Sequence, residues 1–124
     1  MASPIYSLTA ARPADYESFI DGDKLIMMLP ARVNDSLYAN IITELNAAGE
    51  DYVRQILLDC SATRLLTEGG LVSFNRLGEF TRRQRIRLMI LDAAPGISEL
   101  LDALLPLATW VDSFQEAGVR QAAG

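Results

Sequence analysis

The chain has 124 residues, half of them hydrophobic, and a formal net charge of -5. This length suits one domain with a buried core, and the acidic balance argues against nucleic acid as the main partner. The sequence contains no histidine, so the commonest general base and the usual zinc ligand are missing, and its single cysteine, Cys60, excludes an internal disulfide. No apolar run approaches the ~18 residues that a membrane span needs, and no signal peptide is evident. We therefore expect a cytoplasmic domain that binds no cofactor or metal and does not insert into a membrane. Catalysis by carboxylates alone stays open, although the acidic residues are scattered along the sequence.

The N-terminal part predicts a hairpin that follows a less regular segment. Residues 1–15 contain two prolines and predict an N-terminal extension or an extra strand, with a short strand-like run at 5–8. Apolar runs at 18–20 and 25–29 then flank Asp21-Gly22-Asp23. Asp-Gly between two apolar runs is typical of a tight β-turn, so these runs predict two antiparallel strands.

A helix and a buried strand follow in the sequence. Asn34 and Asp35 are candidate helix caps, and Gly49 stands where a helix of this length would end. The apolar residues between them recur at helical spacing. They are Leu37, Ile41, Leu45 and Ala48. The continuous apolar run at 56–58 is typical of a strand covered on both faces.

The second half predicts a helix opened by Gly69-Gly70, with Thr67 at its N-cap. The apolar run at 86–91 predicts the next buried strand, and Pro95-Gly96 predicts the start of a further helix. Several residues mark the buried face of the first of these helices. They are Leu71, Phe74, Leu77 and Thr81.

The C-terminal part predicts a last strand and a last helix. Pro106 ends the preceding helix, and residues 109–111 predict a short strand. Residues 113–116, Ser-Phe-Gln-Glu, match a capping box and predict a short C-terminal helix. Strands separated by single helices favour right-handed crossovers and a mostly parallel sheet. The predicted fold is α/β, a mixed sheet of four to five strands with about four helices packed mainly on one face.

The order of elements and the central sequence resemble the STAS domain, the family of sulfate transporters and anti-sigma factor antagonists. Residues 56–61, ILLDCS, fit the family's apolar strand followed by an aspartate, and residues 67–71, TEGGL, fall where the family has Asp-Ser-Ser-Gly-Leu. Residues 31–34, ARVN, and 110–117, WVDSFQEA, resemble the segments before the first helix and at the last strand. The resemblance covers a domain of residues 16–120, which leaves 121–124 as a tail.

The resemblance implies a bacterial regulatory binding protein that is not an enzyme. Such a protein is similar to anti-sigma factor antagonists and captures an anti-sigma factor of the serine kinase type. In that branch the second serine of the motif is phosphorylated, and here its place is taken by Gly69, which has no hydroxyl. Thr67 and Ser73 are the nearby substitutes that could carry a phosphate. The resemblance also implies a partner-binding surface around the turn. It comprises Arg32, Asn34, Asp35, Thr67, Glu68, Gly69, Gly70 and Leu71.

Two further interpretations concern partners and structure. Stand-alone STAS proteins also bind the ATPase subunit of bacterial lipid-transport ABC systems, in which the motif can read Thr-Gly-Gly, and Gly69-Gly70 is compatible with that role. We expect a monomer or weak homodimer, with Asp59 stabilising the 67–70 turn by accepting backbone N–H bonds. A basic segment over 76–87 is interpreted as a solvated helix end, with an electrostatic dock as the alternative.

Overall fold

The computed structural model describes residues 16–49 and 52–119, so the predicted extension or strand at 1–15 and the tail at 121–124 lie outside the described residues. Within the described ranges, no helix is both long and apolar enough to cross a membrane. The strands are β2 (Glu17–Asp21), β3 (Lys24–Met28), β4 (Arg32–Val33), β5 (Gln55–Asp59), β6 (Leu65–Leu66), β7 (Arg87–Leu91) and β8 (Thr109–Val111). The helices are α1 (Leu37–Ala48), α2 (Glu68–Gln84) and α3 (Pro95–Leu104).

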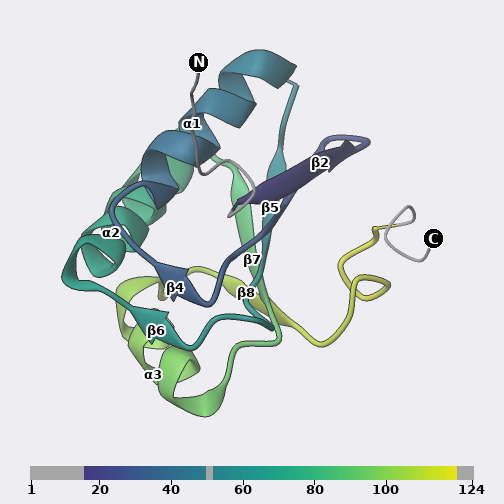
Figure 1. Ribbon diagram of the computed structural model, residues 1–124. Helices are drawn as coiled ribbons and strands as arrows, with labels where there is room; N and C mark the ends of the chain where they lie inside the picture. The colour runs from purple at the N-terminus through teal and green to yellow at the C-terminus, as the bar shows by residue number, and fades with distance from the viewer. Residues whose placement is uncertain (1–15, 50–51, 120–124) are drawn as a thin grey trace, which may run out of the picture.

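The main sheet has five strands in the order β2-β3-β5-β7-β8 (Figure 1). The β2–β3 pair is antiparallel, as the predicted hairpin requires, and Gly22 in its turn has a φ of 62°. The three other pairs are parallel, which confirms the predicted mixed, mostly parallel sheet. A separate parallel pair, β4–β6, was not predicted, because two-residue strands leave no periodic pattern in a sequence.

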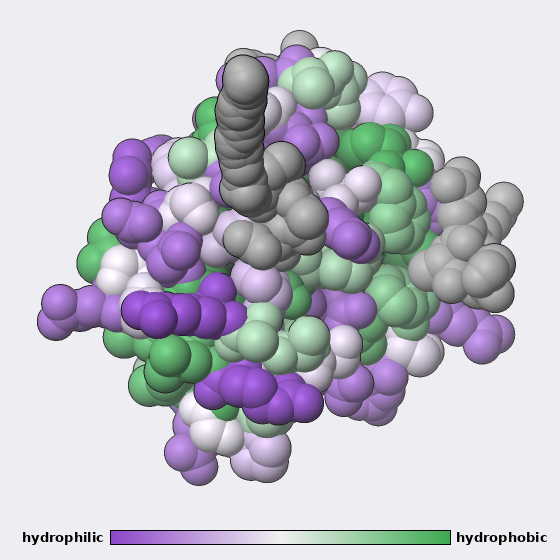
Figure 2. All heavy atoms as spheres, in the orientation of Figure 1, coloured by the Kyte–Doolittle hydropathy of each residue, from purple (hydrophilic) through white to green (hydrophobic). Residues whose placement is uncertain are grey.

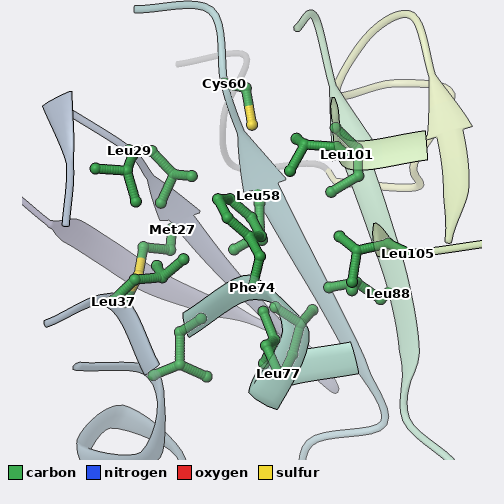
Figure 3. Packing of buried hydrophobic residues seen from close by; sticks show 14 of the residues in the cluster. Met27, Leu29, Leu37, Leu58, Cys60, Phe74, Leu77, Leu88, Leu101 and Leu105 are labelled. Atoms are coloured by element: carbon green, nitrogen blue, oxygen red, sulfur yellow. The ribbon is translucent and has the colours of Figure 1, made fainter. Parts of the chain in front are cut away.

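The three helices lie on one face of this sheet, as predicted (Figure 1). Phe74 of α2 is fully buried and points at Leu58 in the central strand β5 (Figure 3). Alternate residues of each inner strand face the helices, because successive side chains of a strand point to opposite sides. The strand residues in this core are Leu25, Met27, Ile56, Leu58, Leu88 and Ile90.

The other face of the sheet is covered by the C-terminal segment, which runs along it beyond β8 (Figure 1). Ala117 and Val119 are buried there, with Phe114 packed beside them. The remaining strand residues face this second cluster. They are Ile26, Leu57, Met89, Leu91 and Val111. Burial on both faces explains why the inner strands read as continuous apolar runs.

The predicted C-terminal helix is not formed, so the described residues contain three helices instead of about four. One bond of the capping box is nevertheless present, since the Ser113 hydroxyl accepts from the Glu116 N–H at 3.0 Å. The Glu116 carboxylate accepts from the Asp112 N–H at 2.6 Å, one residue before the predicted cap. Gly118, with a φ of 81°, turns the chain after this single turn. One turn does not repay the cost of helix nucleation, and here it serves to bring Ala117 and Val119 onto the sheet.

Candidate functional site

The turn into α2 is held by the side chain of Thr67. This residue is the N-cap, as predicted, and its hydroxyl accepts a hydrogen bond from the Gly70 N–H at 3.0 Å. The same hydroxyl donates to the carbonyl of Val33 at 3.2 Å, and the Thr67 N–H donates to that carbonyl at 3.0 Å. The hydroxyl therefore has both a donor and an acceptor role inside the fold and joins the start of α2 to β4.

The pairing of β4 with β6 explains both glycines of the turn. Arg32 lies opposite Leu65 in the ladder, which places the chain that follows β4 across the first turn of α2. A Cβ on Gly70 would lie 2.3 Å from the Val33 carbonyl oxygen, and one on Gly69 would lie 2.7 Å from the Cβ of Asp35. Neither glycine has a positive φ, so close approach of the neighbouring backbone, and not a special turn geometry, requires them.

The polar groups beneath this surface are paired with one another. The Ser73 hydroxyl, 3% exposed, donates to the Asp35 carbonyl at 3.0 Å and accepts from the Tyr38 N–H at 3.4 Å. The Asn34 side-chain oxygen accepts from the N–H and the hydroxyl of Ser36, at 2.9 and 2.6 Å. Ser36 is the N-cap of α1, and Asn34 stabilises the turn before it. The predicted caps Asn34 and Asp35 lie two positions and one position too early, respectively.

Exposed side chains surround the two glycines, and apolar ones are among them. Arg32, Asn34, Asp35 and Glu68 are exposed, while Leu71 is half-buried against the core. Leu65 and Val72 are large apolar side chains that are 51% and 58% exposed. In Figure 2, which shows the face carrying β4 and β6, hydrophobic residues are interspersed with hydrophilic ones. We define the β4–α2 surface by its eight members: Arg32, Asn34, Asp35, Leu65, Thr67, Glu68, Gly69 and Val72.

Leu65 and Val72 did not emerge from the sequence as surface residues. Val72 stands close to the helical face of Phe74 and Leu77 in sequence, yet it lies four positions after Glu68 and shares the solvent face with it. Leu65 adjoins buried Leu66, and only the register of β6 shows which of the two points outward. The one sequence signal that Val72 is exposed was its position four residues after the charged Glu68, on the same side of the helix.

Asp59 is the last residue of β5 and Cys60 follows it, and the prediction for the 67–70 turn concerns Asp59 alone. The Asp59 carboxylate accepts a bond from the Ser61 N–H at 3.0 Å and so stabilises its own loop. Burial, with a smaller effect from the Asp59 charge, raises the pKa of the Cys60 thiol to about 12. The thiol is therefore protonated and unreactive at neutral pH. Within the part of the chain that the structure describes, no three side chains of His, Cys, Asp or Glu form a group that could hold a metal ion.

Comparison with known proteins identifies the fold. No family model matches the chain, and no curated protein matches it by sequence. Unphosphorylated SpoIIAA, an anti-sigma factor antagonist, is similar with a TM-score of 0.65 at 11% identity, over 88% of this chain and 98% of SpoIIAA. The protein TM1081 has a TM-score of 0.69 at 16% identity, over 95% of each chain. The murine anion transporter Slc26a9 has a TM-score of 0.62 at 10% identity, over 83% of this chain and 18% of the transporter.

At these identities the matches establish architecture. The chain is a STAS-like α/β domain, as its resemblance to the family predicted, and it has the fold of SpoIIAA over nearly all of the latter's length. The residues carried over from the family pattern to the β4–α2 surface remain predictions, as do the partners.

Proposed function

We propose that this chain is a non-catalytic regulatory binding protein that captures an anti-sigma factor of the kinase type, or a related bacterial partner, through the β4–α2 surface. The single observation that carries the proposal is the close approach of Asp35 to Gly69 and of Val33 to Gly70. Because of this close approach, the N-terminus of α2 and the segment after β4 form one continuous surface. Exposed Leu65 on β6 and exposed Val72 on α2 supply apolar area for a partner.

The proposed capture proceeds without phosphorylation at the usual serine position. Gly69 has no acceptor, and the space that a side chain would need there is occupied by the Asp35 Cβ. The two substitutes are also poor acceptors, because the Thr67 hydroxyl bonds to Val33 and Gly70, and the Ser73 hydroxyl is buried. A phosphate on either would have to break the contacts that close the surface. Capture therefore depends on partner abundance or on the partner's own state.

The test is affinity capture from the native bacterial host in its cytoplasmic fraction, followed by mass spectrometry. Val72→Glu and Leu65→Glu each add a negative charge to the β4–α2 surface without entering the core. We expect the wild-type chain to retain a kinase-type anti-sigma factor and both variants to lose it. Tyr52→Glu is the matched control, since Tyr52 is 54% exposed but lies on the connection between α1 and β5. Undiminished capture by both variants would overturn the assignment of this surface.

The same experiment distinguishes the alternative partner, the ATPase subunit of a lipid-transport ABC system. The Gly69-Gly70 pair is compatible with that class, whose motif can read Thr-Gly-Gly. Capture of an ABC ATPase that depends on Val72 would assign the chain as an accessory subunit of a transporter. A gene neighbourhood with an ATPase and a permease, in place of an anti-sigma factor or phosphatase, would agree with that result.

A further inference from the structure

A second candidate site lies at the other end of α2, in a cleft of about 280 Å³. Its walls come from the second half of α2, the start of β7 and the connection between α3 and β8. The cleft sits at the edge of the sheet where the parallel strands begin, whereas the β4–α2 surface is at the edge where they end. It therefore shares no residue with the proposed partner surface.

The interior of the cleft is mostly apolar. Its lining includes Ile86, Leu104, Leu105, Leu107 and Ala108, and Leu107 is 75% exposed at the protein surface. Gly78 belongs to the same wall, and a Cβ there would lie 2.8 Å from Cδ2 of Leu105, so α2 and α3 approach closely at this point. The volume corresponds to roughly nine groups the size of a water molecule, at about 30 Å³ each.

The rim of the cleft is cationic, although the chain as a whole carries a net charge of -5. Arg82, Arg85 and Arg87 line it together with one acid, Glu79. Arg82 is neutralised by Glu79 at 2.6 Å, and Arg87 lies 3.5 Å from the Thr109 hydroxyl. Arg85 has no ion-pair partner among the residues that the structure describes. Two guanidinium groups are thus left to attract an anion.

The backbone at Arg85 adopts a conformation that is uncommon for residues other than glycine. This residue is the C-cap of α2 and adopts a φ of 59° and a ψ of 40°, the left-handed geometry in which glycine is most common. The cap is otherwise of the usual kind, since the Ile86 N–H donates to the Thr81 carbonyl at 2.9 Å. An arginine here carries a conformational cost that glycine would avoid, and such outliers concentrate at functional positions.

We propose that this cleft binds a small amphipathic anion, with its charged head between Arg85 and Arg87 and a single aliphatic chain against Leu104, Leu105 and Ala108. The cationic rim complements the head, because a guanidinium binds carboxylate and phosphate through paired N–H donors. The apolar wall contacts the aliphatic chain, whose length is limited by the cleft volume of about 280 Å³. A carboxylate or a phosphate head satisfies the same chemistry, and the test below separates them.

The test is a titration of the full-length protein followed by two-dimensional amide NMR, with octanoate, octyl phosphate, 1-octanol and inorganic phosphate as separate probes. We expect saturable shifts confined to the cleft with octanoate or octyl phosphate, and a Kd of about 1 mM or tighter for a ligand of this size. The stronger of the two identifies the head group. Octanol binding as tightly as octanoate, or inorganic phosphate as tightly as octyl phosphate, would overturn the proposal.

Two variants test the role of Arg85 separately from folding. Arg85→Gly removes the charge at a position whose backbone geometry suits glycine, so the fold is expected to be retained, and affinity for the preferred amphiphile should fall about tenfold. Arg83→Gln is the matched control, because Arg83 is an exposed neighbour that does not line the cleft. Equal affinities for Arg85→Gly and the wild type, or an equal loss in both variants, would contradict a specific head-group site.

Discussion

At the N-terminal end of α2, two glycines adopt ordinary helical geometry, whereas at its C-terminal end an arginine adopts the left-handed geometry that glycine usually takes. Neighbours explain the first case, because Val33 and Asp35 occupy the space into which side chains at 70 and 69 would project. The second case cannot be explained by space, since Arg85 is exposed. The two ends of α2 thus differ in what limits the choice of residue. At the N-terminal end the limit is the space left by neighbouring atoms, and at the C-terminal end it is the charge that we propose for anion binding.

Among the variants that test this comparison, Gly70→Ala should cause the largest loss of stability. The added Cβ would lie 2.3 Å from the Val33 carbonyl oxygen, which also accepts two bonds from Thr67, so the strand–helix junction would have to separate. We expect a loss of about 3 kcal/mol in the free energy of unfolding, measured by urea denaturation. Gly96→Ala is the control, since a Cβ there would meet nothing within 4 Å, and it should be neutral or slightly stabilising. Equal stabilities for the two variants would disprove steric closure at this end.

A smaller effect is expected from Gly69→Ser, which restores the hydroxyl of the family motif. Its Cβ would lie 2.7 Å from the Cβ of Asp35, and we expect about 1 to 2 kcal/mol of destabilisation from the required shift.

The double variant Gly69→Ser with Asp35→Gly removes the obstructing atom and should recover most of this loss. Asp35→Gly alone supplies the fourth corner of a double-mutant cycle, measured by the same urea denaturation. Simple additivity of the two single changes would mean that Asp35 does not block the serine position.

These glycines also mark how far the sequence alone could be interpreted. The hairpin, the helices α1, α2 and α3 and the buried strands followed from periodicity and turn residues, because each pattern extends over several residues. Thr67 could be placed as an N-cap for the same local reason. The β4–β6 pair could not be predicted. The need for glycine at 69 and 70 could not be predicted either, because the residues that approach them lie more than thirty positions earlier in the sequence.

The C-terminal segment shows a different limit. Residues 113–116 form one hydrogen bond of the predicted capping box, but Gly118 and the burial of Ala117 and Val119 determine the path that follows. The local motif therefore predicted the bond between Ser113 and Glu116 correctly, and it predicted the continuation as a helix wrongly. The cleft at Arg85 could not be predicted from the sequence for a related reason. Its walls come from three separate elements, whereas the sequence indicated only a basic helix end.

The smallest effect, and the sharpest test of the comparison, is the stability of Arg85→Gly. Glycine relieves the left-handed backbone in the folded state, but it also widens the conformational freedom of the unfolded chain, and the two effects are of similar size. We therefore expect a change of roughly 1 kcal/mol or less, with a melting temperature no lower than that of the wild type in calorimetry. A clear loss of stability would mean that the Arg85 side chain supports the fold itself. Unchanged or raised stability would show that the fold does not need the Arg85 side chain, and the affinity of Arg85→Gly for the amphiphile then tests whether ligand binding does.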